Sequence, residues 1–258
     1  MKEKIYTIPV TEAFSVECEC PLCVLHKKLE DENLVYILGP SLMEPDGRIE
    51  TNEKGFCQRH FEKLYNRQEN RLGLGLIIDT HMQEQNKNIQ KTYDEAKVLL
   101  RKDSNLSTMQ NFTQRFTSSK KGEKNGVDLL IDALDRLENK CAICDKLERT
   151  MDRYIDVILY LYFEEQDFAR IFDSKKGFCL MHFKDLLVGA KNHLSPKQAA
   201  IFTDKLAKME LENLERIQKE VNWFTKKFDY RYNDAPWENS KDSLPRSIEK
   251  LVGYCEFK

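Results

Sequence analysis

Residues 54–61 read Lys-Gly-Phe-Cys-Gln-Arg-His-Phe, and residues 176–183 read Lys-Gly-Phe-Cys-Leu-Met-His-Phe. The second stretch lies 122 residues after the first, and a Cys-x2-Cys pair precedes each of them. A match of this length, with its parts in the same order, indicates an internal duplication. The sequence therefore predicts two related repeats, each built around the same set of cysteine and histidine residues.

The cysteine and histidine residues of each repeat have the spacing of metal ligands. Each repeat contains Cys-x2-Cys, then 33 or 34 residues, then Cys-x2-His. Three thiolates and one imidazole complete a tetrahedral zinc site, and residues i and i+3 of a helix start project from the same face. We therefore expect two zinc ions per chain, one in each repeat. The predicted ligands are Cys20, Cys23, Cys57 and His60 in the first repeat and Cys141, Cys144, Cys179 and His182 in the second.

Other uses of these residues remain open. Iron or an iron-sulfur cluster also accepts thiolate-rich sites, and buried inert cysteines are common in protein cores. A thioredoxin-like redox role would need a βαβ context, and an attached c-type haem would need a histidine directly after the second cysteine. Because all four predicted ligands come from the protein, the pattern favours a structural metal over a catalytic one.

Several cysteines and histidines lie outside this pattern. Cys18 places a third thiol beside the first Cys-x2-Cys pair, and the second repeat has no equivalent. Cys18 is either a packed or solvent-facing residue, or a thiol that reacts or exchanges with Cys20. Cys255 is interpreted as a packed residue of the tail. His26 lies three residues after Cys23 and is interpreted as a helix-surface histidine, with a fifth metal ligand as the alternative. His81 and His193 have no spacing that indicates catalysis.

Apolar residues recur three or four positions apart, and no region alternates with period two, so the sequence predicts an all-α fold. The expected architecture is a tandem duplication of a three-helix unit, forming a helical bundle with a metal site in each repeat. In the first repeat a helix ends near Gly39, a loop runs through residues 44–47, and two further helices follow. Ser195-Pro196 is typical of a helix start in the second repeat.

The expected boundaries follow the repeats. Residues 1–103 form the first metal-binding repeat, residues 127–228 the second, and residues 229–258 a C-terminal tail. Residues 104–126 are rich in polar residues and are predicted to be a linker. The tail is expected to pack back on the body through Trp237 and Leu251.

Composition narrows the class of protein. The chain has 258 residues, of which 41% are hydrophobic, and 41 basic against 43 acidic residues give a net charge of −2. This balance argues against a nucleic-acid partner bound through bulk charge. The longest apolar run, residues 155–163, is shorter than a membrane span, and residues 1–10 do not resemble a signal peptide. We therefore expect a cytoplasmic protein with reduced thiols and no membrane contact.

From Ile5 to Gly75 the chain carries Cys-Pro-Leu-Cys, a Met-Glu-Pro-Asp loop and Lys-Gly-Phe-Cys-x2-His-Phe. With these motifs it resembles an uncharacterised bacterial family found mainly in anaerobic Firmicutes, and the resemblance extends over the whole chain. The resemblance implies a cytoplasmic bacterial protein and provides no catalytic residue. Scarce oxygen would add weight to the iron alternative.

The expected function is that of a zinc-binding helical protein with two structural Cys3His sites, serving as a scaffold for an unknown protein or small ligand. The familiar catalytic motifs are missing from the sequence, which leans against an enzyme. One alternative is an iron-sulfur or thiol-based redox enzyme or sensor that uses the site near Cys18. Another is a zinc-dependent transcription regulator, although each long helix mixes both signs of charge. The coiled-coil-like spacing from Leu214 to Phe228 allows a homodimer.

Overall fold

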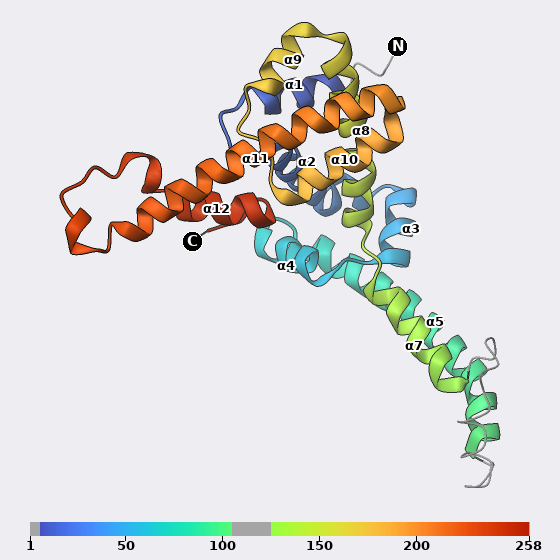
Figure 1. Ribbon diagram of the computed structural model, residues 1–258. Helices are drawn as coiled ribbons and strands as arrows, with labels where there is room; N and C mark the ends of the chain where they lie inside the picture. The colour runs from blue at the N-terminus through green and yellow to red at the C-terminus, as the bar shows by residue number, and fades with distance from the viewer. Residues whose placement is uncertain (1–5, 105–124, 258) are drawn as a thin grey trace. The chain divides into compact units, whose positions relative to one another are not determined.

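The protein is described by a computed structural model that covers residues 6–104 and 125–257. In these ranges all regular structure is helical and no strand occurs, which confirms the all-α class (Figure 1). The helices are α1 (Thr7–Ser15), α2 (Pro21–Leu38), α3 (Pro45–Lys54), α4 (Gln58–Arg67), α5 (Arg71–Ser104), α7 (Gly126–Glu138), α8 (Ala142–Glu164), α9 (Gln166–Asp173), α10 (Leu180–His193), α11 (Pro196–Lys226) and α12 (Ser243–Val252), with 3-10 turns η2 (Pro40–Leu42), η3 (Tyr230–Tyr232) and η4 (Glu238–Ser240).

The same order of helices occurs twice. The series α2, α3, α4, α5 and the series α8, α9, α10, α11 each run from a long helix through two shorter ones to another long helix. The predicted three-helix unit is therefore corrected to four helices. The missed helix α3 is almost entirely polar and buries only Thr51, so it lacks the apolar periodicity of a core helix. Its proline stands in the first turn, where proline is compatible with a helix.

The described chain divides into two compact units. The central unit contains residues 31–146, and the terminal unit contains residues 1–30 and 147–258. These units differ from the predicted domains, because the first 30 residues join most of the second repeat and residues 127–146 join the first. Of the predicted linker, residues 105–124 lie outside the described residues.

In the central unit, α5 and α7 lie side by side, and α3 packs against α5 (Figure 1). Gly126 at the start of α7 allows a close approach, since a Cβ there would lie 2.7 Å from the carbonyl oxygen of Ala96. Asn125 and Asp128 form a capping box that starts α7. Apolar side chains from several helices fill the core of this unit, namely Leu34, Ile37, Leu38, Leu64, Leu74, Ile77 and Ala96.

The terminal unit is built around a cluster of aromatic rings. Phe14 of α1 stacks on Phe172 of α9 with ring centroids 5.7 Å apart, and Phe172 also contacts Phe178 and Phe202. Helix α11 begins with a capping box formed by Ser195 and Gln198, and the predicted helix start is thereby confirmed. Helix α8 contributes further core side chains, among them Ile155, Ile158 and Leu159.

The tail packs back on the terminal unit through Trp237, one of the two residues expected, but not through Leu251. Trp237 lies against Phe224 with ring centroids 6.1 Å apart, as predicted, whereas Leu251 is 57% exposed. Helix α12 packs against α10 and α11 and buries Ser243 and Lys250. The described helices include none that is long and apolar enough to cross a membrane.

Candidate metal centres

Two clusters gather the eight predicted ligands, four in each. Cluster A contains Cys20, Cys23, Cys179 and His182, and cluster B contains Cys57, His60, Cys141 and Cys144. In each cluster the four ligand atoms lie within 4.8 Å of one another. The predicted grouping, with one complete site inside each repeat, is therefore wrong. Each cluster combines the Cys-x2-Cys pair of one repeat with the Cys-x2-His pair of the other.

The ligand pairs of one repeat are separated by one long and one short helix. After Cys20 and Cys23, the 18-residue helix α2 carries the chain about 27 Å onward, and the 10-residue helix α3 covers about 15 Å. In the second repeat α8 has 23 residues and α9 has 8. In the structure each Cys-x2-Cys pair is completed by the Cys-x2-His pair of the other repeat.

The ligand pairs occupy equivalent positions at four helix starts. Cys57 is the N-cap of α4 and Cys179 is the N-cap of α10. Cys20 and Cys141 directly precede the first residues of α2 and α8. In each pair the second ligand is the third helical residue, so both side chains face the same space. Helix N-termini carry a partial positive charge, which stabilises thiolates there.

Cluster A has the dimensions of a tetrahedral metal site. The Nδ1 atom of His182 lies 3.5 Å from Cys20 Sγ, 3.4 Å from Cys23 Sγ and 3.1 Å from Cys179 Sγ. The Sγ atoms of Cys23 and Cys179 are 3.7 Å apart. Zinc-sulfur and zinc-nitrogen bonds of usual length give tetrahedral edges of about 3.8 Å between sulfurs and about 3.5 Å between sulfur and nitrogen. The donor set thus fits a metal ion.

Cluster B has the same dimensions. The Nδ1 atom of His60 lies 3.3 Å from Cys57 Sγ, 3.2 Å from Cys141 Sγ and 3.4 Å from Cys144 Sγ. The Sγ atoms of Cys57 and Cys144 are 3.8 Å apart. His60 is fully buried. This cluster also offers three sulfurs and one Nδ1 atom, so the two clusters are chemically alike.

The thiols of cluster A differ in their affinity for protons. Burial and hydrogen bonding to Cys179 raise the pKa of Cys20 well above its ordinary value. Hydrogen bonding to Cys179 raises the pKa of Cys23 to about 12, whereas hydrogen bonds with Cys20 and Cys23 lower the pKa of Cys179. Cys179 is therefore the thiol of the cluster that ionises most readily, whereas Cys20 and Cys23 hold their protons at neutral pH. A divalent cation would displace those two protons.

Cluster B shows a similar division. Burial raises the pKa of Cys144. Burial also opposes ionisation of Cys141, but hydrogen bonds with His60 and with the backbone N–H groups of Cys144 and Cys57 outweigh it and lower its pKa to about 6. Cys141 is thus ready to bind a cation as a thiolate at neutral pH.

Residues outside the ligand set support the two sites, and except for the repeated glycine they carry no recognisable pattern in the sequence. Gly55 precedes the Cys-x2-His pair of cluster B with φ +59°, and His81 packs against it. Gly177 occupies the matching place in cluster A with φ +74°, and Glu210 and Lys250 pack against it. The repeated glycine marks a turn that favours glycine, but nothing in the sequence links it to these partners.

The remaining cysteines and histidines lie outside both clusters. Cys18 contacts the carbonyl of Val16 at 3.7 Å, and burial raises its pKa, which makes it a weaker nucleophile at neutral pH. The Cys255 thiol contacts the carbonyl of Gly253 at 3.5 Å. His26 lies beside the His182 ring, and His193 Nε2 is 3.0 Å from Asp152 Oδ1.

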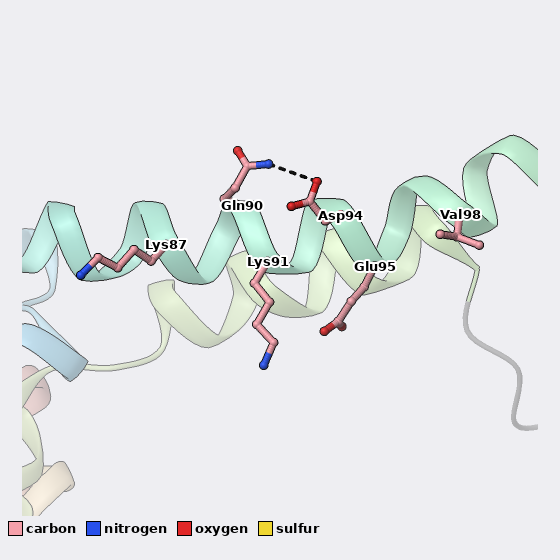
Figure 2. A pocket seen from close by; sticks show the side chains of 6 residues that line it. All are labelled: Lys87, Gln90, Lys91, Asp94, Glu95 and Val98. Carbon is pink, nitrogen blue, oxygen red and sulfur yellow. Dashed lines mark hydrogen bonds between the residues drawn. The ribbon is translucent and has the colours of Figure 1, made fainter.

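Three surface hollows lie along α5, beside α11 and beside α8, and none of these three is lined by a cluster ligand. One lies along α5 and is lined by Lys87, Gln90, Lys91, Asp94, Glu95 and Val98. Figure 2 shows these side chains projecting from α5, with Gln90 donating a hydrogen bond to Asp94 at 3.2 Å. The residues around this hollow are charged or polar except for Val98, and they show no arrangement typical of catalysis.

Comparison with known proteins adds a family but no activity. A family model described as a family of unknown function (DUF6062) matches residues 1–258. No curated protein and no solved structure matches the chain. The two clusters are therefore the features of the described chain that indicate a function.

Proposed function

The chain belongs to the DUF6062 family, and we propose that it is a zinc protein whose two structural Cys3His sites hold together an interaction scaffold. The observation that carries this proposal is the match of both clusters to the edges of a zinc-centred tetrahedron. Three sulfurs and one nitrogen complete the four-coordinate shell. A shell filled by protein ligands leaves no position for substrate, which favours structure over catalysis.

The choice of zinc rests on the donor set. Thiolate and imidazole are the usual ligands of structural zinc, and zinc does not change its oxidation state in proteins. A structural zinc site contributes about 10 to 16 kcal/mol of apparent binding free energy in small domains near neutral pH. Two such sites would be a large part of the stability of this chain.

With its metals enclosed by protein ligands, the chain would act through its surface. We therefore assign it the role of a scaffold for a protein or a small ligand. The thiolate ligands require a reducing compartment, which fits a cytoplasmic location.

The first test is elemental analysis with an absorption spectrum, on protein purified without oxygen and without a metal-affinity tag. We expect two zinc ions per chain and no visible absorption. Iron with a band near roughly 400 nm would replace the zinc proposal with cluster chemistry. Protein that is folded and free of metal would contradict the proposed function.

A further inference from the structure

A fully buried ion pair lies behind the turn that leads into cluster A. Lys250 of α12 and Glu210 of α11 have side chains that are 0% and 1% exposed, with 3.3 Å between Nζ and Oε1. Lysine and glutamate are almost never buried to this degree unless they are paired, because removing both charges from water is costly. Because burying both charges is costly, we expect this pair to have a function at this position.

The pair fixes the backbone on both sides of Gly177. Lys250 Nζ donates a hydrogen bond to the carbonyl of Lys176 at 2.7 Å, and the N–H of Phe178 donates to Glu210 Oε2 at 2.8 Å. A Cβ at Gly177 would lie 2.6 Å from Glu210 Oε2 and 2.9 Å from Lys250 Nζ, so the fit is tight. The next residue after Phe178 is the ligand Cys179. The pair therefore sets the direction in which the Cys-x2-His pair is presented.

The residues that follow α12 contact cluster A directly. A Cβ at Gly253 would lie 3.7 Å from Cys179 Sγ and 3.9 Å from Cys23 Sγ, so this backbone covers both thiols. The backbone N–H of Tyr254 donates a hydrogen bond to the Cys23 thiol. Lys27 of α2 pairs with Glu256 at 2.8 Å. The C-terminal segment thus contacts both halves of cluster A.

Cluster B is supported in a different way. His81 Nδ1 is 2.8 Å from the carbonyl of Asn52, and Gln85 Nε2 donates to the carbonyls of Asn52 and Glu53 at 3.0 and 3.2 Å. His81 and Gln85 are not a buried ion pair. Both come from α5, which lies in the same repeat as Cys57 and His60. Of the two clusters, cluster A is the one whose Cys-x2-His turn is held by a side chain of the C-terminal helix, Lys250.

We propose that metal binding at cluster A and docking of α12 are thermodynamically coupled, with Lys250 and Glu210 as positioning residues. The proposal rests on the proposed metal binding and adds its regulation. Metal in cluster A stabilises the docked C-terminal segment, and loss of that metal releases it. Coupling is reciprocal, so undocking α12 weakens metal binding at cluster A by the same factor.

The forward test compares Lys250→Met with Gln85→Ala in the full chain. Methionine replaces the unbranched stem of lysine without its ammonium group and leaves the Lys176 carbonyl without its donor. We expect Lys250→Met to weaken metal binding at cluster A by about 10-fold or more and to spare cluster B. Gln85→Ala should affect cluster B only. Competition with a chelator, in backgrounds where Cys57→Ser with Cys141→Ser removes cluster B or Cys20→Ser with Cys179→Ser removes cluster A, assigns each affinity.

A double variant separates positioning from the cost of an unpaired charge. In Lys250→Met with Glu210→Gln the buried charge is gone, and the glutamine oxygen still accepts from the Phe178 N–H. The positioning role requires that the loss at cluster A persists, because the Lys176 carbonyl still lacks its donor. Full recovery of metal affinity would overturn the proposal.

The reverse test follows α12 by hydrogen exchange. In the full chain, a chelator should speed exchange of the backbone amides of residues 243–252, and removal of the cluster A ligands should do the same without chelator. If α12 stays equally protected with and without metal in cluster A, the coupling is absent. A wild-type chain that binds no metal would instead contradict the proposed function, which elemental analysis of the same sample distinguishes.

Discussion

His60 and Cys141 lie 81 residues apart in the chain, yet His60 Nδ1 is 3.2 Å from Cys141 Sγ. Pairs of cysteine variants test this pairing directly. Cys57→Ser with Cys141→Ser removes two ligands of one cluster, so we expect one metal ion per chain to remain. Cys57→Ser with Cys179→Ser removes one ligand from each cluster, so we expect both ions to be weakened or lost. Elemental analysis after gel filtration gives the stoichiometry.

Cys57→Ser with Cys179→Ser is the control, because it damages both sites whichever way the ligands are grouped. If each repeat held its own site, Cys57→Ser with Cys141→Ser would damage both sites and Cys57→Ser with Cys179→Ser would also damage both. Cys20→Ser with Cys57→Ser then decides, because it would cost a single ion under that grouping. The structure places Cys20 and Cys57 in different clusters, and it therefore requires damage to both.

The protonation of cluster A predicts how its metal affinity depends on pH. The raised pKa of Cys20 and the pKa of about 12 for Cys23 mean that both thiols hold protons at neutral pH, and metal binding must release them. Protons therefore compete with the metal, and affinity rises with pH. Two displaced protons give a rise of about 100-fold per pH unit between roughly pH 7 and 8.5. Chelator competition in the Cys57→Ser with Cys141→Ser background measures this slope, and a flat profile would contradict the assignment.

At the scale of elements, the packing of α10 on α8 depends on a glycine. A Cβ at Gly189 would lie 2.2 Å from Ile155 Cγ2, so Gly189→Ala forces the two helices or the isoleucine to move. We expect a loss of about 1 to 3 kcal/mol in the free energy of unfolding. Gly75 of α5 is the matched control, because its Cβ would meet nothing within 4 Å. Gly75→Ala should stabilise the protein by about 0.5 to 1 kcal/mol.

Denaturant unfolding of the metal-loaded variants, followed by circular dichroism, checks both substitutions. Because both replace glycine by alanine within a helix, the gain in helix propensity is the same and only the packing differs. Equal stabilisation by the two variants would show that α10 does not pack closely on α8.

Several helices that carry apolar stripes or caps were predicted from the sequence, whereas the polar helix α3 and the short helix α9, which buries Phe168 and Phe172, were not. Ser195 and Gln198 have the capping-box pattern, and the structure confirms a helix start there. Helix α3 buries one residue only, so its periodicity carries no signal. The eight clustered residues were also predictable, since their spacing repeats. Their pairing was not, because the spacing in both repeats fits either grouping, and only the packed structure shows which one forms.

At the scale of the whole molecule, both clusters and the aromatic core of the terminal unit join residues from both repeats. Cluster A joins Cys20 and Cys23 to Cys179 and His182, and Phe14 stacks on Phe172. The repeats therefore complete each other, in the manner of two subunits that exchange equivalent parts. A break in the chain between the repeats should leave these connections in place.

A protease site inserted between residues 104 and 125 of the full chain tests this mutual dependence, with cleavage after folding and metal loading. We expect the two fragments to elute together from a sizing column with two metal ions, because each cluster takes two ligands from each fragment. Cleavage of the Cys57→Ser with Cys141→Ser variant should give a co-eluting pair with one ion. Separation of the native fragments, each with one ion, would mean that each repeat binds metal alone. Because each fragment lacks half of both ligand sets, that result is incompatible with the exchanged clusters.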